Sequence, residues 1–154
     1  VVARARSARV QAWTAEAVRA GAEVPAAGKR TGKTLTPGLL ANVPHNAKVS
    51  CKEIFGPVSI VAPYHEFSDA LTMVNDSDFG LGGSVFTRDV ARGKRVASRV
   101  ETGMMFVNNI SWSDAELPFG GIKNSGYGRE LGDMGIQEFV NKKLVRTGSI
   151  EAPA

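Results

Sequence analysis

The sequence predicts an α/β fold, a parallel sheet with flanking helices. Apolar and β-branched runs at 58–61, 81–87 and 104–107 have the length of buried strands. Helical patterns separate these three runs from one another. Strands that are joined through helices return in the same direction, so this order predicts parallel pairing with right-handed crossovers.

The N-terminal segment is predicted to form a helix over residues 2–20. Apolar residues recur there at spacings of three and four along one face: Val10, Trp13, Ala17 and Ala20. Gly21 suits the left-handed residue that ends many helices. After this helix we expect a short strand at 22–24, a loop at 25–38 that is rich in glycine and proline, and another short strand at 39–43.

Two further helices are predicted between the three strands. The first has an apolar face with helical spacing, formed by Phe67, Ala70, Leu71 and Val74. The second is expected to begin at Thr87, whose hydroxyl can cap a helix N terminus. Its inward-facing residues would be Val90, Val96, Ala97 and Val100.

Residues 108–128 interrupt this regular order with glycines and polar side chains. They follow the carboxyl end of a predicted strand, which is the edge where open α/β sheets bind ligands. Long irregular segments inside compact domains are usually functional. A last strand is expected at 136–146, separated from the sheet and therefore free to pair with another subunit.

The composition limits the classes of function. The 154 residues are 43% hydrophobic and 22% charged, as in globular proteins with a core. No apolar stretch reaches the roughly 20 residues that a membrane helix needs, so we expect no membrane partner. The net charge of +4 raises nucleic-acid binding as an alternative, but the basic residues are scattered and we expect no nucleic acid. Without a signal-peptide pattern a cytoplasmic location is expected. Because the chain begins with Val1 rather than methionine, we expect it to be a fragment.

Three patterns that suggest chemistry are weak. Residues 28–34 resemble a phosphate-binding loop, but three residues stand where that motif needs four. Cys51 lies beside Lys52, a setting that can activate a thiol, yet an inert cysteine is the simpler interpretation. The two histidines, His45 and His65, give no metal-ligand spacing, so no metal is expected.

Glu53 and Phe55 form a more suggestive pair. Two residues apart on an extended chain, their side chains would face the same side. A carboxylate and an aromatic ring on one side can hold a ribose diol and a flat nicotinamide ring. From the spacing alone, a surface glutamate beside a core phenylalanine is the simpler interpretation.

Five sequence runs, taken together, resemble the C-terminal portion of the aldehyde dehydrogenase superfamily. Any one of these runs would be weak evidence, but all five occur in the family's order and spacing. The runs are Glu53-Ile54-Phe55-Gly56-Pro57-Val58, Val74-Asn75-Asp76 with Phe79-Gly80-Leu81, Ser84 to Asp89, Gly103-Met104 with Val107-Asn108, and Pro118 to Glu130. Residues 126–141 are most similar to the succinate-semialdehyde dehydrogenase subgroup.

The resemblance implies a role for four residues and the cofactor NAD or NADP. Glu53 would hold the nicotinamide ribose, and Phe55 would pack against the nicotinamide. Ser113, within the loop 108–117 that shapes substrate choice, would bind the carboxylate of succinate semialdehyde. Phe119 would line the tunnel for the small aldehyde substrate.

The resemblance also implies how this chain fits a longer enzyme. Residues 1–128 would be the C-terminal part of the catalytic domain. Residues 129–154 would be a tail whose strand at 136–146 completes the sheet of a neighbouring subunit in a homo-oligomer. The family's nucleophilic cysteine lies farther upstream than the 52 residues that precede Glu53 here, so Cys51 does not match it.

We therefore expect no catalytic residue in this chain, since the general-base glutamate and the cofactor domain of the family would also lie outside it. The full-length enzyme would oxidise an aldehyde to the carboxylate through a cysteine thioester. The 154-residue chain alone would be inactive. The alternative is a non-catalytic interaction module that pairs with its partners through the terminal strand.

Overall fold

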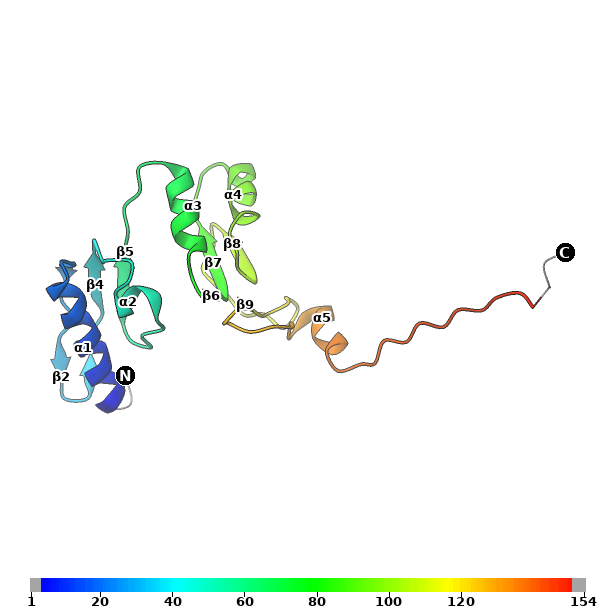
Figure 1. Cartoon of the computed structure of the whole chain (residues 1–154), viewed down its shortest axis with the longest axis horizontal. Coiled ribbons are helices and arrows are strands. Elements are labelled where there is room, and N and C mark those ends of the chain that lie inside the picture. The colour runs from blue at the N-terminus through cyan, green and yellow to red at the C-terminus, as the bar shows by residue number, and fades with distance from the viewer. Residues whose placement is uncertain (1–3, 151–154) are drawn as a thin grey trace. The chain divides into compact units, whose positions relative to one another are not determined.

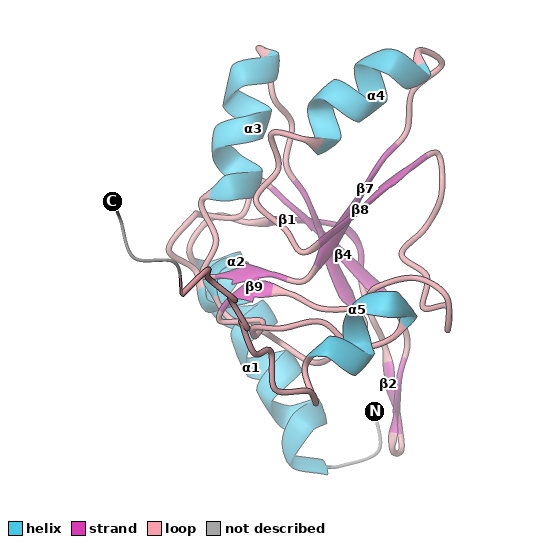
Figure 2. Ribbon diagram, turned by 90° about the vertical axis from the view of Figure 1, so that its right-hand side faces the viewer, coloured by secondary structure: helices cyan, strands magenta, loops and turns pink. Residues whose placement is uncertain are grey.

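The computed structural model describes residues 4–150 and divides into two compact units, Val1–Ser77 and Asp78–Ala154 (Figure 1). Both units contain helices and strands, which confirms the predicted α/β class (Figure 2). Within residues 4–150, every helix is too short or too polar to span a lipid bilayer. The domain boundary expected after residue 128 stays a prediction.

The first unit contains a small sheet in the order β1-β4-β5, with β1 antiparallel and β5 parallel to β4. Its elements are α1 (Arg4–Arg19), β1 (Glu23–Ala26), β2 (Arg30–Thr31), β3 (Thr34–Leu35), β4 (Gly38–Ala41), α2 (Lys48–Cys51), β5 (Val58–Val61) and α3 (Phe67–Asn75). The antiparallel hairpin β2–β3 lies inside the segment expected to be a loop. Gly32, with φ of 60°, permits its tight two-residue turn.

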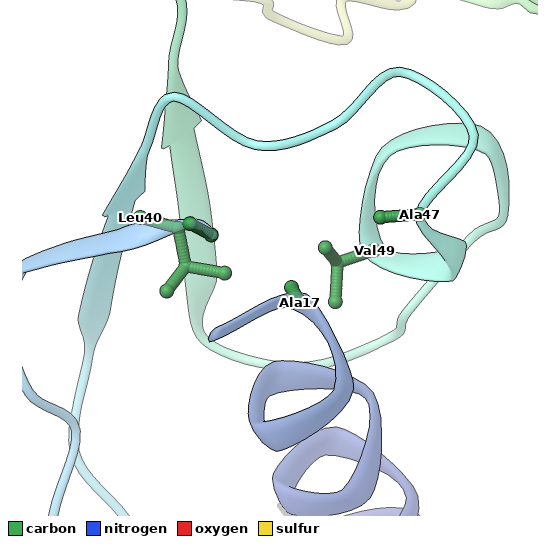
Figure 3. Packing of buried hydrophobic residues seen from close by; sticks show 5 residues of the cluster. Ala17, Leu40, Ala47 and Val49 are labelled. Carbon is green, nitrogen blue, oxygen red and sulfur yellow. The ribbon is translucent and has the colours of Figure 1, made fainter. Parts of the chain in front are cut away.

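The core of the first unit is built around α1, β4 and α2 (Figure 3). Leu40 of β4 and Ala17 of α1 are 1% and 0% exposed. Ala17 of α1 and Ala47 at the start of α2 are small, so α1 can pack closely against Leu40 of β4 and Val49 of α2. Helix α1 ends as predicted, since Gly21 has φ of 105°.

The second unit is organised by the parallel pair β7 and β8. Its elements are β6 (Phe79–Gly80), β7 (Gly82–Val85), α4 (Val90–Ala97), β8 (Met104–Val107), β9 (Ile122–Lys123) and α5 (Gly132–Gln137). The pairing runs in register from Gly82–Met104 to Val85–Val107. Helix α4 connects the two strands and contacts both of them, while β6 pairs with β9 in the antiparallel sense.

Asp89, not Thr87, caps α4. The Asp89 carboxylate accepts a hydrogen bond from the backbone N–H of Arg92 at 2.9 Å, which is the usual geometry of an N-cap. The Thr87 hydroxyl lies two residues earlier and accepts from the N–H of Asp89 at 3.2 Å. The prediction of Thr87 as the cap was wrong because two capping residue types stand close together at this turn.

The parallel direction predicted for the strands at 81–87 and 104–107 is confirmed in β7–β8. β5 is also parallel to its neighbour, but that neighbour is β4, a pairing that the sequence did not predict. The three predicted strands nevertheless do not form one sheet, since β5 pairs with β4 and β7 pairs with β8. The strand predicted at 81–87 is shorter than expected, Gly82–Val85, and pairs with β8; Phe79–Gly80, which precedes the predicted run, forms the separate strand β6 and pairs with β9.

The strand expected at 136–146 is wrong for this chain taken by itself. Ile136 and Gln137 belong to α5, and residues 138–150 contain turns and irregular backbone (Figure 1). A strand needs a second strand to satisfy its backbone N–H and C=O groups. None of the strands described in residues 4–150 pairs with this segment.

Gly93 in α4 allows the helix to lie against β8, and we expect Gly93→Ala to destabilise the protein. An added Cβ would lie 2.7 Å from Cγ1 of Val107 and 3.0 Å from Cγ2 of Thr87. Overpacking of this kind costs about 1–3 kcal/mol, more than alanine gains in helix propensity. Urea unfolding should show a net loss of about 1–2 kcal/mol.

Gly148→Ala is the matched control for this prediction, because a Cβ at Gly148 meets no atom within 4 Å. Equal unfolding free energies for the two variants would contradict the packing described for α4.

Candidate functional site

Glu53 and Phe55 lie on the short irregular segment between α2 and β5. The Glu53 side chain is exposed, and Phe55 is 58% exposed although it is a large apolar residue. Phe55 has φ of 51°, so the chain turns there and is not extended as the sequence suggested. An aromatic residue in the left-handed region is strained, and such strain is often found at binding sites.

Helix α1 contacts three consecutive residues of this segment and holds it in place. The Arg9 guanidinium donates a hydrogen bond to the Ile54 carbonyl at 3.1 Å. The Arg6 guanidinium lies over the Phe55 ring, 5.8 Å from its centroid. Gly56 packs so closely on Val10 that an added Cβ would collide with a Val10 methyl group.

The arrangement can bind a polar, flat ligand. An exposed carboxylate accepts hydrogen bonds from hydroxyl groups, and an exposed ring offers a face for stacking. The sequence singled out Glu53 and Phe55, but it did not connect them with Arg6 and Arg9. The one available signal was the i, i+3 spacing of the two arginines, which puts both on the same face of the predicted helix.

Ser113 and Phe119 line one pocket of about 390 Å³ in the second unit. Its lining includes residues of β8 and of the loop that follows β8. The other lining residues are Gly103, Met104, Met105, Phe106, Trp112, Asp114, Leu117, Pro118, Arg129 and Met134. The wall is mostly apolar with few polar groups, which is typical of small-molecule sites.

Phe119 is fixed by the returning chain. Its backbone N–H donates to the Glu130 carbonyl at 2.7 Å, and its carbonyl accepts from the Glu130 N–H at 2.8 Å. Arg129, next to Glu130, donates to the carbonyls of Gly121 at 3.0 Å and Gly128 at 2.6 Å. The half-buried arginine therefore organises the glycine-rich turn, a function that the sequence analysis missed.

The two predicted pairs belong to different compact units, Glu53 and Phe55 to the first and Ser113 and Phe119 to the second. Cys51 is half-buried, with its sulfur 3.8 Å from the Asn46 carbonyl oxygen. Among residues 4–150, no group of three or more histidine, cysteine, aspartate or glutamate side chains could hold a metal ion.

We expect Phe55→Gly to be more stable than Phe55→Ala. Both variants lose the ring, but only glycine adopts a positive φ without a penalty, which for other residues is about 1 kcal/mol. The difference between the two urea unfolding free energies should be of that size.

The same pair of substitutions at Ile54 is the control, because Ile54 does not have a positive φ. There the alanine variant should be the more stable one. The same order of stability at both positions would contradict the left-handed conformation of Phe55.

The chain is similar in sequence to known proteins. Residues 1–145 match the model of the aldehyde dehydrogenase family. The chain is 44% identical over 140 residues to succinate-semialdehyde dehydrogenase [NADP(+)] of Deinococcus radiodurans, a match that covers 89% of this chain and 29% of the relative. It is 37% identical over 138 residues to 3-sulfolactaldehyde dehydrogenase of Priestia aryabhattai, again covering 89% of this chain and 29% of the relative.

The chain is also similar to solved structures of aldehyde dehydrogenases. Succinic semialdehyde dehydrogenase from Streptococcus pyogenes, in complex with NADP+, is similar with a TM-score of 0.89 and 37% identity. This similarity covers 96% of the chain and 33% of the solved one. The chain thus spans about a third of the length of the relatives it matches. Since the family model matches nearly all of its residues, the chain belongs to the aldehyde dehydrogenase family.

Proposed function

We propose that this chain is the C-terminal part of an NAD(P)-dependent aldehyde dehydrogenase that oxidises succinate semialdehyde or a similar anionic aldehyde to the carboxylate. The observation that carries the proposal is the shared pocket of Ser113 and Phe119. The resemblance in sequence assigns both residues to the substrate, and they lie in the same pocket wall. The names of the two relatives also point to aldehydes with an anionic group.

Glu53 and Phe55 fit a nicotinamide cofactor. Bound NAD or NADP would accept a hydride from the aldehyde carbon. The exposed Glu53 carboxylate would accept hydrogen bonds from the ribose hydroxyls. The exposed Phe55 ring would cover one side of the nicotinamide, and Arg6 and Arg9 would keep the segment in position.

The substrate pocket suits a short aldehyde with a carboxylate. Its apolar wall can cover the carbon chain and exclude water. The exposed Ser113 hydroxyl would donate a hydrogen bond to the substrate carboxylate, and Phe119 would pack against the chain near the aldehyde. The nucleophilic cysteine and the general base that the family uses are assigned to residues outside this chain, so no catalytic residue is proposed here.

We also propose that the protein forms a homo-oligomer through the segment 138–150. Two observations support it: large apolar side chains of this segment are exposed, among them Phe139 at 85% and Leu144 at 89%, and its backbone has no strand partner among residues 4–150. The same observations favour the alternative function, a non-catalytic interaction module. The two functions differ in whether a longer protein with this chain oxidises aldehydes.

Ser113→Ala in the full-length enzyme is expected to weaken binding of succinate semialdehyde. A hydrogen bond to a charged group contributes about 1.5–3 kcal/mol, which corresponds to a rise of about tenfold or more in the Michaelis constant. The constant for butanal, which has the same carbon chain without the carboxylate, should change little. Steady-state kinetics with both aldehydes measures the difference.

Ser111→Ala is the control variant, because Ser111 is exposed and does not line the pocket. Equal effects of Ser113→Ala on the two aldehydes would sink the assignment of Ser113 to the carboxylate.

The purified 154-residue chain should form no NADH or NADPH from succinate semialdehyde, because its one cysteine, Cys51, does not match the nucleophile that the resemblance places farther upstream. Production of reduced cofactor would contradict the assignment of the nucleophile to another part of the enzyme.

Light scattering should show self-association of the 154-residue chain, and removal of residues 138–150 should reduce it to a monomer. An unchanged mass after the truncation would contradict assembly through this segment.

A further inference from the structure

Asn108 stands where β8 ends and the irregular loop 109–117 begins. Its backbone has φ of 57°, so the chain changes direction at this residue. Its N–H still donates to the carbonyl of Val85, the last residue of β7, at 2.8 Å. Asn108 is therefore both the last residue tied to the parallel pair and the first residue of the turn.

The side chain of Asn108 adds a second connection between the two strand ends. Its Oδ1 accepts a hydrogen bond from the backbone N–H of Thr87 at 2.7 Å. Its Nδ2 donates to the carbonyl oxygen of the same Thr87 at 2.8 Å. One amide thus satisfies both backbone groups of a residue that lies 21 positions away in sequence.

Asparagine is the residue type that meets all of these requirements. It tolerates the left-handed region better than most residues, and its amide is both donor and acceptor. An aspartate would keep the acceptor for the Thr87 N–H, but it would set a carboxylate oxygen against the Thr87 carbonyl. Glycine would keep the backbone conformation and lose both side-chain hydrogen bonds.

The other end of the loop is also held. Gly132 donates its N–H to the Ala115 carbonyl at 2.9 Å, and Phe119 is paired with Glu130. Ser113 lies in the middle of the segment between these anchors. If the first anchor is released, the loop can move about its second anchor, and Ser113 moves with it.

We propose that Asn108 is a positioning residue for substrate recognition, because its amide fixes the direction in which the loop 109–117 leaves β8 and thereby places Ser113 in the pocket. This inference rests on the proposed function of Ser113. Asn108 is exposed, so water can replace its hydrogen bonds and their loss costs little stability. The effect of the residue lies in the position of the loop.

The test compares Asn108→Asp and Asn108→Gly with Asn109→Asp in the full-length enzyme. Asn109→Asp is a matched control: it adds the same charge one residue farther along, and Asn109 uses only its Oδ1, which accepts from the Ile110 N–H at 2.9 Å. Any repulsion of an anionic substrate by the new charge is therefore present in the control. The readouts are amide hydrogen exchange of residues 109–117 and steady-state kinetics with succinate semialdehyde and the cofactor.

Both Asn108 variants should exchange faster in 109–117 but not in α4. Their Michaelis constant for the aldehyde should rise about tenfold or more, since a displaced binding group loses most of its effect. The turnover number and the Michaelis constant for the cofactor should stay within about threefold of the parent values, and Asn109→Asp should resemble the parent. A purely structural function of Asn108 would not change the aldehyde constant alone.

Exchange and kinetics of Asn108→Asp equal to those of Asn109→Asp would overturn the inference. Faster exchange with an unchanged aldehyde constant would overturn it as well, because the loop would then move without affecting substrate binding. If the full-length protein oxidises no aldehyde, faster exchange in the Asn108 variants alone still supports the positioning of the loop, and only the proposed function falls.

Discussion

Close packing at a glycine determines where each candidate site lies. At Gly56 the missing Cβ makes room for Val10, so successive turns of α1 reach the carbonyl of Ile54 and the ring of Phe55. At Gly103 the missing Cβ makes room for the carbonyl of Gly120, which an alanine side chain would strike. In both places the backbone next to an aromatic residue of a candidate site rests directly on a regular element or on the residue just before one. Neither aromatic residue needs a large core of its own to keep its position.

The parts of the fold that the sequence predicted are those whose signal is local. The face of α1 was predicted from its helical period and β8 from its short continuous apolar run, and both signals lie within a single element. The hairpin at 30–35 escaped prediction because two-residue strands have no period to detect. The strand at 136–146 was predicted from its apolar residues, but a strand exists only with a neighbour, and pairing is not a property of one segment.

In the candidate site, too, the sequence predicted what is local and missed what depends on contacts between distant segments. Residue type and spacing singled out Glu53 and Phe55, and the resemblance gave them a role. The left-handed backbone of Phe55 could not be predicted, because aromatic residues rarely adopt it. Ser113 and Phe119 stand in a segment without periodicity, and only the return of the chain at Glu130 brings them into one pocket wall. The sequence could name these residues by resemblance, but it could not supply the contacts that hold them.

The tail after α5 has a thermodynamic consequence. Residues 138–150 leave their backbone groups to water and keep several large apolar side chains exposed. If a second chain covers them, the free energy gained there belongs to association rather than to folding of one subunit. Stability would then follow mass action, and the melting temperature would rise with protein concentration. For such a protein, dilution acts as a mild denaturant.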